Sequence, residues 1–406
     1  MDFLGFSWKY IGEGNAHIVL EVVNSNFVLR ITKENDKTTD LCTIQKSVDF
    51  VNKVMTPLLF HHSVEPYEIV KLKIHEVIKL REQLQAFRPE HRKIKSVLSN
   101  IAIKAPNLSI VSSKFNTNYC LEIKPKEGFM SNSLRRYSKC YYCMKQFLKL
   151  HENKIDSVSK YCPLDLFSGD KMLMKKALLN LIDNPQNNLK LFKNGMLVYH
   201  EKSLRSAFDS IMKEIAIFQG NINLFLDSII AIFLCGSERL TCVPETSDNF
   251  TDTSAADLCT ENIKLSPNNF LHKLLEIQKL SETPVDSEEI LMESTDYVSS
   301  FIEIIDAERL ILTDEKHRQR LYSVCNPQYL ALIGSVVKDC SIMISFSEYL
   351  EDGVPTIQIG DQKLSYKLAV TDLEPKSAKT LLKRKETEKK LVEIYEKYAG
   401  NTKNHE

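Results

Sequence analysis

The sequence has 406 residues, of which 43% are hydrophobic, and its 53 lysines and arginines balance 53 aspartates and glutamates. A chain of this length and composition can bury one large core or two packed lobes, and it is not disordered as a whole. Because the formal net charge is zero, no overall field attracts the protein to nucleic acid or to a membrane surface. A polyanionic ligand must therefore be bound by a local cluster of cations.

The sequence lacks the signals of secretion and membrane insertion. The start, MDFLGFSWKY, has no basic region followed by an apolar run, and the longest apolar stretch, residues 229–235, is too short to cross a bilayer. We therefore expect a monomer of the cytoplasm or nucleus, without a membrane span or a nucleic-acid partner. Ten irregularly spaced cysteines indicate free thiols and not a disulfide framework.

The first elements along the chain are strands. Residues 18–23 and 27–31 are rich in branched apolar side chains, and the Asn24-Ser25-Asn26 turn between them predicts a β-hairpin. Between about residues 41 and 88 the apolar spacing approaches the helical period, as in residues 67–84, until Pro89 ends the pattern. A strand is predicted at residues 118–124, and helices at 138–153 and 171–183.

The remaining chain combines strands with helices. Residues 243–262 contain five acidic and no basic side chains among many Ser and Thr, which predicts a mobile surface insertion. Residues 341–346 and 364–370 predict paired strands, and residues 380–398 predict a charged helix. Strands followed by a mostly helical remainder predict an α+β protein with a small N-terminal lobe, residues 1–107, and a larger lobe, residues 108–406.

Two features of the N-terminal region are typical of phosphate binding. Gly12-Glu13-Gly14-Asn15 precedes a predicted strand, and glycines in such a turn let backbone NH groups approach phosphate oxygens. An ordinary hairpin turn is the alternative explanation. Arg30 interrupts an apolar run on the next predicted strand, where a kinase-like small lobe carries a cation for ATP phosphates. An exposed arginine on an edge strand would have the same pattern.

Two further motifs carry cations and amides. In Glu122-Ile-Lys124-Pro-Lys126, an extended chain would place the alternate residues on one face with the lysines about 7 Å apart. That separation suits neighbouring phosphates on a small ring, although a solvated strand edge is the alternative. Asn187 and Asn188 follow the helix predicted to end at residue 183, and they can either turn the chain or supply amides to metal-bound phosphates.

The C-terminal region supplies a pair of carboxylates and a basic run. Asp339 lies where one predicted strand begins and Asp372 where a later one ends, and antiparallel pairing would bring these ends together. Phosphoryl transfer needs one carboxylate to accept the hydroxyl proton and another to hold magnesium, whereas capping of turns is the alternative role. Residues 376–390 contain seven basic and two acidic side chains, which predicts a local binding patch for a ligand with many phosphates.

Cysteines 140 and 143 are spaced like metal ligands. Cys162 or a histidine could complete a site with them, but structural zinc takes four ligands and the sequence contains no second matching pair. We therefore interpret Cys140 and Cys143 as ordinary thiols.

Taken together, these segments resemble the inositol-pentakisphosphate 2-kinase family. The similar stretches occur in order along nearly the whole chain, and EIKPK at residues 122–126 matches that family's signature. They are residues 8–20 (WKYIGEGNAHIVL), 28–33, 88–92, 122–129, 161–169 (YCPLDLFSG), 185–190 and 338–346.

The resemblance implies a two-lobed, distantly protein-kinase-like fold that binds ATP and Mg²⁺ between the lobes and inositol pentakisphosphate on the larger lobe. It implies that Asp339 is the base acting on the axial 2-hydroxyl and that Asp372 is a magnesium ligand. The implied ATP contacts are Gly12, Glu13, Gly14, Asn15, Arg30, Arg92, Glu122, and Asn187 or Asn188. The implied substrate contacts are Lys124, Lys126, Lys149 and Lys376.

The chain also departs from the family pattern. Family members carry an arginine four residues after the position of Lys376, where this chain has Thr380, so that Lys379, Lys383 or Arg384 would have to replace it. Plant members have a zinc site in the larger lobe, which we do not expect here because residues 280–320 contain no cysteine. A non-catalytic inositol phosphate sensor is the alternative function. A protein kinase is disfavoured because no His-Arg-Asp or Asp-Phe-Gly sequence occurs.

Overall fold

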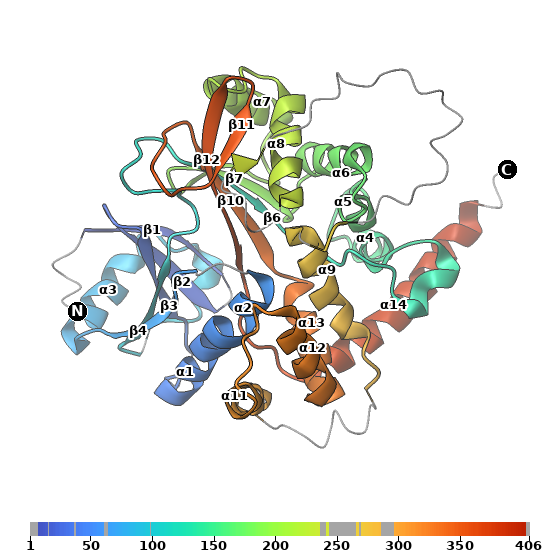
Figure 1. The fold of residues 1–406 in the computed structure, drawn as a ribbon, viewed down its shortest axis with the longest axis horizontal. Helices are drawn as coiled ribbons and strands as arrows, with labels where there is room; N and C mark the ends of the chain where they lie inside the picture. Colours follow the sequence, from blue (N-terminus) through green and yellow to red (C-terminus); the bar gives the residue numbers. More distant parts are fainter. Residues whose placement is uncertain are drawn as a thin grey trace.

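The computed structural model describes residues 7–14, 16–35, 38–60, 64–97, 99–235, 241–242, 265–267, 269–285 and 296–402. The expected mobile insertion, residues 243–262, lies outside the described residues, and so does Asn15. Within the described chain, strands form two sheets, one of five and one of seven strands, and helices cover the larger sheet (Figure 1). Every helix in this part of the chain is too short or too polar to cross a membrane.

The smaller sheet is formed by the N-terminal region and has the order β1-β2-β3-β5-β4. Its strands are β1 (Trp8–Glu13), β2 (His17–Val22), β3 (Phe27–Thr32), β4 (Glu68–Lys71) and β5 (Ile101–Pro106). Pairing of β2 with β3 confirms the predicted hairpin. Helix α3 (Ile74–Leu84) buries Leu80 in the same apolar cluster as Leu20 and Leu29.

The helical prediction for residues 67–84 is wrong at its N-terminal end. Residues 68–71 form β4, an edge strand whose Ile69 is paired with Ile103 of β5. The helix begins only at Ile74, where the Glu76 side chain accepts a hydrogen bond from the backbone NH of Lys73 at 2.7 Å. Pairing with a distant strand thus outweighs a local apolar spacing that is ambiguous over four residues.

The larger sheet has the order β8-β7-β6-β10-β12-β11-β9. Its strands are β6 (Tyr119–Ile123), β7 (Leu189–Lys193), β8 (Met196–Tyr199), β9 (Thr241–Cys242), β10 (Ser341–Ser347), β11 (Thr356–Ile359) and β12 (Gln362–Thr371). The strand predictions at 118–124, 341–346 and 364–370 are confirmed. Antiparallel pairing of β10 with both β6 and β12 brings the end of β6, the start of β10 and the end of β12 to one edge of the sheet.

Helices follow the apolar patterns of the remaining chain and pack in a large common core. The predicted helices at 138–153, 171–183 and 380–398 correspond to α4 (Tyr141–His151), α6 (Lys171–Asp183) and α14 (Lys379–Thr402). The other helices of the larger part are α5 (Pro163–Leu166), α7 (Arg205–Glu214), α8 (Ile222–Leu234), α9 (Phe270–Lys279), α11 (Tyr297–Ala307), α12 (Glu315–Val324) and α13 (Pro327–Val337), with short turns η3 (Glu90–Arg92), η4 (Asn132–Tyr137) and η6 (Leu280–Glu282).

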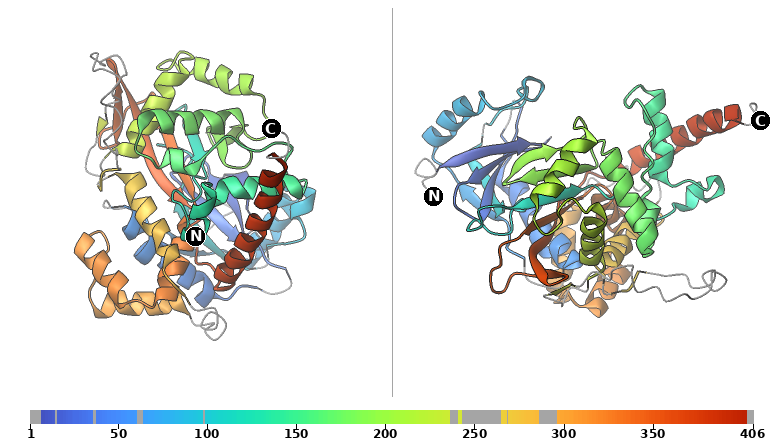
Figure 2. Two further views of the ribbon diagram at one scale, coloured as in Figure 1. Left: turned by 90° about the vertical axis from the view of Figure 1, so that its right-hand side faces the viewer. Right: turned by 90° about the horizontal axis from the view of Figure 1, so that it is seen from above.

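The fold confirms the predicted two-lobed α+β class, with the smaller sheet and the C-terminal end of α14 at opposite ends of the molecule (Figure 2, right). One N-terminal segment nevertheless belongs to the larger core. It comprises the π-helix η2 (Phe50–Met55) and α2 (Thr56–Leu59), whose Phe50, Val54 and Leu58 are buried among side chains of the larger part. The preceding helix α1 (Leu41–Asp49) instead packs against β5 of the smaller sheet. The lobe boundary at residue 107 therefore stays a sequence-based prediction.

Gly334 allows α13 to approach the turn η6 closely. A Cβ atom at this position would lie 2.3 Å from the backbone nitrogen of Ser281, and backbone atoms cannot rotate away. We expect Gly334→Ala to lower the free energy of unfolding by about 2 kcal/mol, since overpacking of about 3 kcal/mol exceeds a helix-propensity gain of about 1 kcal/mol. Urea unfolding measures this loss. Gly14→Ala, with nothing within 4 Å, is the control, and equal midpoints for the two variants would contradict the expectation.

Candidate active site

The sheet edge at which β6, β10 and β12 meet gathers the charged residues expected from the sequence. Lys124 follows β6, Asp339 precedes β10 and Asp372 follows β12. The pairing of Ser341 with Thr371 confirms that the two aspartates lie at neighbouring strand ends. Lys124 Nζ lies 3.1 Å from Asp372 Oδ2, and Lys126 Nζ lies 2.7 Å from Asp339 Oδ1. Each carboxylate therefore faces a lysine of the EIKPK motif.

The expectation that Glu122, Lys124 and Lys126 share one face is wrong. Strand β6 ends at Ile123, and Lys126 has a left-handed backbone with φ of 61°. This turn sends Lys124 and Lys126 toward different cavities. Alternation along an extended chain holds only while the chain stays extended, and the motif leaves the sheet after its second residue.

Glu122 lies beneath this edge and supports the carboxylate of Asp372. Ser341 Oγ lies 2.9 Å from Glu122 Oε1 and 3.2 Å from Asp372 Oδ2, so its hydroxyl lies between the two carboxylates and can donate its single proton to either. Lys190 Nζ donates to Glu122 Oε2 at 3.1 Å. Glu122 is not among the described side chains that line the neighbouring cavity. From this position Glu122 can orient the Asp372 carboxylate through Ser341.

A cavity of about 640 Å³ lies between the smaller sheet and the edge of the larger one, and we call it the interlobe cavity. Several residues predicted to contact ATP line it: Glu13, Gly14, Arg30, Arg92 and Asn187, together with Asp339 and Asp372. Lys124, expected to contact the other substrate, also lines this cavity. Gly12 and Asn188 are not among its described lining residues. Asn188 is buried, and its Nδ2 donates to the Tyr142 hydroxyl at 2.9 Å.

Arg30 connects the two sides of the interlobe cavity. Its guanidinium on β3 forms an ion pair with Glu374, which follows β12, and donates to the Tyr67 hydroxyl at 3.3 Å. Burial opposes the charge of Arg30, but Glu374 and Tyr67 raise its pKa above the ordinary value. Burial and Arg30 together lower the pKa of the adjacent His17 to about 4. At neutral pH this cavity therefore presents Arg30 as a cation and His17 as a neutral ring.

Glu13 of the glycine-rich segment is held by two cations of the smaller sheet region. Lys33 Nζ lies 2.8 Å and Arg88 Nε 3.0 Å from its carboxylate oxygens, and all three side chains are nearly inaccessible. These contacts fix the end of β1 next to Gly14. A Cβ atom added at Gly14 would meet no atom within 4 Å other than those of its chain neighbours. A phosphate group therefore has room to approach the backbone here.

A second cavity of about 320 Å³ lies on the other side of Asp339, and we call it the polycationic cavity. Seven cationic side chains but only two carboxylates, Glu127 and Asp339, are among the described residues that line it. The cations come from the EIKPK segment, α4, the end of α13, and α14 with the segment leading into it: Lys126, Lys145, Lys149, Lys338, Lys376, Lys383 and Arg384. Such a cavity is suited to a small ligand with many negative charges.

Two of these cations, Lys145 and Lys338, were missed in the sequence. Lys145 precedes Lys149 by four residues on α4, so helical spacing from Lys149 could have identified it. Lys338 adjoins Asp339, and Lys383 had been considered only as a replacement for a missing arginine. Lys379, by contrast, is not among the described side chains that line either cavity. Burial, Lys126 and Lys149 lower the pKa of Lys145, as expected where like charges are held together without a ligand.

The two cavities meet at Asp339 and Lys376, which line both. Lys376 Nζ donates to the carbonyl of Ser335 at 2.8 Å, and its backbone NH donates to the hydroxyl of Tyr297 at 2.9 Å. Burial acts to raise the pKa of Asp339, but contact with Lys126 and the proximity of Lys376 lower it below the ordinary carboxyl value. Asp339 is thus an ionised carboxylate between the two cavities at neutral pH.

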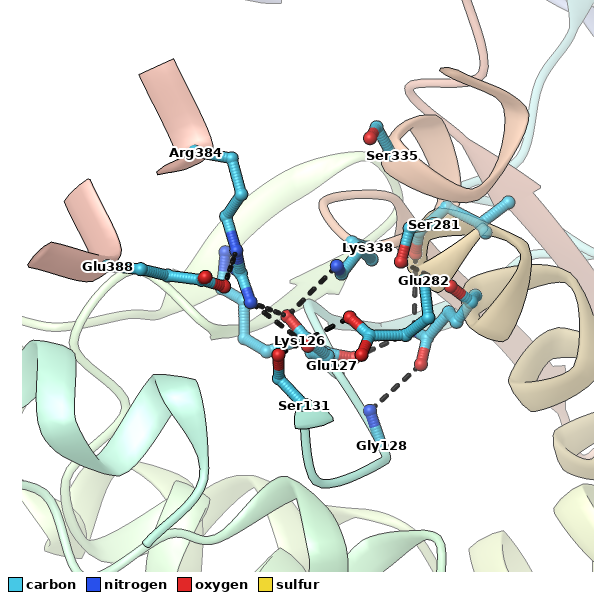
Figure 3. A network of polar contacts seen from close by, with 12 residues as sticks. Lys126, Glu127, Gly128, Ser131, Ser281, Glu282, Ser335, Lys338, Arg384 and Glu388 are labelled. Carbon is cyan, nitrogen blue, oxygen red and sulfur yellow. Dashed lines mark hydrogen bonds and ion pairs between the residues drawn. The ribbon is translucent and has the colours of Figure 1, made fainter. Parts of the chain in front are cut away.

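Arg384 occupies the region where an arginine was expected at position 380. It reaches from α14 to the buried Glu127, with an NH2–Oε2 distance of 2.8 Å, and also contacts Glu388 on its own helix (Figure 3). Its guanidinium lies 3.1 Å from the centroid of the Tyr141 ring. Because Thr380 and Arg384 are one helical turn apart, both face the polycationic cavity. The chain therefore retains an arginine there, displaced by one turn.

The cysteine pair is joined by Cys162, which the sequence offered, alongside a histidine, as a third ligand. The sulfur atoms of Cys140, Cys143 and Cys162 lie within 4.8 Å of one another. Three thiols would fill three positions of a tetrahedral zinc site, and no fourth Cys, His, Asp or Glu joins them among the described residues. None of the three cysteines is among the described residues that line either cavity.

A two-lobed fold with a polycationic cavity beside an interlobe cavity defines a class of proteins that bind small polyanions. Comparison with known proteins is more specific, because the sequence model of the family described as inositol-pentakisphosphate 2-kinase matches residues 10–390. The chain is 27% identical to the inositol-pentakisphosphate 2-kinase of Danio rerio, over 96% of this chain and 92% of the relative. The identity is 25% to the Arabidopsis thaliana protein of that name, over 96% and 93%.

A fungal relative extends the same match. The inositol-pentakisphosphate 2-kinase of Cryptococcus neoformans is 24% identical, over 95% of this chain and 92% of the relative. The chain therefore belongs to the inositol-pentakisphosphate 2-kinase family, and the resemblance inferred from its sequence is confirmed.

Proposed function

We propose that this chain transfers the γ-phosphate of ATP to the axial 2-hydroxyl of inositol pentakisphosphate, forming inositol hexakisphosphate and ADP. Family membership supports an ATP-dependent inositol phosphate kinase. The observation that carries the finer proposal is the junction of the two cavities at Asp339 and Lys376. A carboxylate between a nucleotide-sized cavity and a polycationic one is where an acceptor hydroxyl must meet a terminal phosphate.

In this proposal the interlobe cavity binds ATP. Arg30, Arg92 and Lys124 line it as cations for the phosphates, and Gly14 leaves the backbone accessible. Asp372 has a carboxylate that is about half exposed and lies at the same edge, and oxygen donors of this kind suit magnesium. When bound there, magnesium would neutralise phosphate charge. Glu122 acts through Ser341, which keeps the Asp372 carboxylate in place.

Asp339 serves as the general base. It accepts the proton of the 2-hydroxyl as that oxygen forms its bond to the γ-phosphorus, and the bond from the γ-phosphorus to the bridging oxygen breaks with its electrons leaving on ADP. A carboxylate kept ionised by Lys126 and Lys376 is ready to accept this proton at neutral pH. Lys376, at the junction, is placed to balance charge on both reactants.

The polycationic cavity captures the pentakisphosphate. Its seven cations come from four separate segments of the chain, so that phosphates around a ring can each meet a different element. Lys149 and Lys145 approach from α4, while Lys383 and Arg384 approach from α14. Burial and repulsion from neighbouring lysines lower the pKa of Lys145 and Lys149, and a bound polyanion would offset this repulsion.

Measuring binding and transfer separately tests this function against that of a sensor. The enzyme proposal expects calorimetric binding of inositol pentakisphosphate and, with magnesium and γ-labelled ATP, transfer of label to the inositol phosphate. A sensor would bind the same ligand without transferring label. Binding without transfer, over a range of magnesium and nucleotide concentrations, would reject the enzyme proposal and support the sensor.

The lowered pKa of Lys338 predicts that activity declines at alkaline pH. Burial and Arg384 lower its pKa to about 8, although Glu127 opposes the shift. As pH rises through this value the lysine loses its proton, so the cavity loses a positive charge and substrate capture weakens. We expect kcat/KM, which reports the free enzyme, to decline above about pH 8. Lys338→Arg stays charged and should move the decline to higher pH, whereas an unchanged profile would contradict the role of Lys338.

A further inference from the structure

Gln278 of α9 joins the two segments that carry Lys126 and Asp339. Its side chain is fully buried and forms hydrogen bonds to backbone atoms of those segments. Oε1 accepts a hydrogen bond from the Gly128 NH at 2.8 Å, while Nε2 donates to the carbonyls of Lys126 at 2.8 Å and Val337 at 3.3 Å. Lys126 and Gly128 belong to the turn shown in Figure 3, and Val337 is the last residue of α13.

The turn that Gln278 holds needs external support. Lys126 has a φ of 61°, a conformation that costs a non-glycine residue about 1–2 kcal/mol. The preceding carbonyl, of Pro125, accepts a hydrogen bond from the Tyr161 hydroxyl at 2.6 Å. At Gly128 an added Cβ would lie 2.3 Å from the Phe167 ring. The turn is thus fixed on several sides. Two contacts connect it to the end of α13: the side chain of Gln278, and an ion pair of 3.4 Å between Lys338 Nζ and Glu127 Oε2.

The end of α13 determines where Asp339 lies. Lys338 and Asp339 follow Val337 directly, and the Asp339 NH donates to the carbonyl of Val336 at 3.2 Å. A displacement of the Val337 carbonyl would therefore be transmitted to the carboxylate two residues later. On the other segment, the same glutamine amide holds the carbonyl of Lys126, whose Nζ meets Asp339 Oδ1.

We propose that Gln278 is a positioning residue that fixes the separation between the substrate-binding Lys126 and the general base Asp339. This inference rests on the proposed function. The amide suits the task because it offers an acceptor to one NH and two donor hydrogens to two carbonyls in a single planar group. A buried carboxylate would instead face two carbonyl oxygens, and an apolar side chain would leave three backbone groups without partners.

The test compares Gln278→Met with a matched variant elsewhere. Asn118 is also a buried amide that holds backbone groups, accepting from Val111 NH at 2.8 Å and donating to the carbonyls of Ser112 and Phe115 at 3.1 Å. It precedes β6, at the end of the strand opposite Lys124. Asn118→Leu therefore loses comparable hydrogen bonds without touching the site, and urea unfolding shows whether the two variants are equally destabilised.

We expect Gln278→Met to lower kcat and raise KM for inositol pentakisphosphate, with a combined loss in kcat/KM of about ten- to a hundredfold. KM for ATP should change by less than about threefold, because Gln278 bonds Lys126, Gly128 and Val337, and none of these is among the described residues lining the interlobe cavity. Asn118→Leu should leave these constants near those of the wild type. Equal kinetic losses in the two variants would overturn the inference, whereas an inactive wild type would reject the proposed function itself.

Gln278→Glu provides a second readout if the methionine variant does not fold. The buried carboxyl is expected to have a raised pKa, and its protonated form regains one donor hydrogen for a carbonyl. Activity relative to wild type should therefore recover as pH falls from about 8 to about 6, in the range of documented pKa values for buried carboxyls. A relative activity that is independent of pH would contradict the positioning role.

Discussion

Replacing Asp339 with asparagine is expected to lower kcat by about 10²–10⁴-fold, the usual contribution of a general base. Asparagine keeps the shape of the side chain but cannot accept the hydroxyl proton. Binding of inositol pentakisphosphate should be retained or become tighter, because the change removes one of only two carboxylates among the described residues lining the polycationic cavity. Transfer of label from ATP measures kcat, and calorimetry measures binding.

The control for this variant is Asp361→Asn in the exposed turn between β11 and β12, which should behave as the wild type. A loss of binding that parallels the loss of kcat would mean that Asp339 holds the site together and does not act as the base. Retention of full kcat would exclude both roles.

Replacing Lys376 with glutamine is expected to reduce kcat/KM by about a hundredfold. Lys376 lines both cavities, and a hydrogen bond to a charged group contributes about 1.5–3 kcal/mol, where about 2.7 kcal/mol corresponds to a factor of 100. The variant should also show a weaker dependence of KM on ionic strength, since one cation fewer is available for salt to screen. Steady-state kinetics at several salt concentrations provides both quantities.

Lys389→Gln is the matched control for Lys376→Gln. Lys389 belongs to the same basic C-terminal segment but is exposed on α14 and is not among the described residues lining either cavity. Its replacement should change kcat/KM by less than about twofold, as for an exposed surface charge. Comparable losses in the two variants would show that the basic run acts through its overall charge and that the junction position of Lys376 has no special role.

The sequence predicted those parts of the site that depend on local pattern. The branched apolar run at 341–346 and the alternation at 364–370 specify strands, and their antiparallel pairing brings Asp339 and Asp372 to one sheet edge. The EIKPK motif marked Lys126 correctly as a residue of the polycationic cavity. The strands at 341–346 and 364–370 keep one regular conformation close to the functional residue, whereas Lys126 was identified by its motif and not by its conformation.

The parts that were not predicted depend on contacts between distant segments or on a change of backbone conformation. Lys124 and Lys126 separate because Lys126 takes a left-handed conformation that Gln278, 152 residues later, helps to hold. Arg384 takes the place near Thr380 because Glu127, in another segment, forms an ion pair with it. Cys162 was named as one candidate partner of Cys140 and Cys143, but only the fold distinguishes it from the histidines. The residues in each of these contacts are not related by a regular sequence spacing, so a sequence pattern could not have shown that they meet.

The proposed 2-kinase activity is tested most directly by identifying the products formed from two isomeric inositol pentakisphosphates. One isomer has its free hydroxyl at the axial 2-position, and the other has an equatorial free hydroxyl. With magnesium and ATP, we expect inositol hexakisphosphate from the first isomer and little or none from the second. ³¹P NMR identifies the product in each case. Equal conversion of both isomers, or no hexakisphosphate from the first, would contradict the proposed activity.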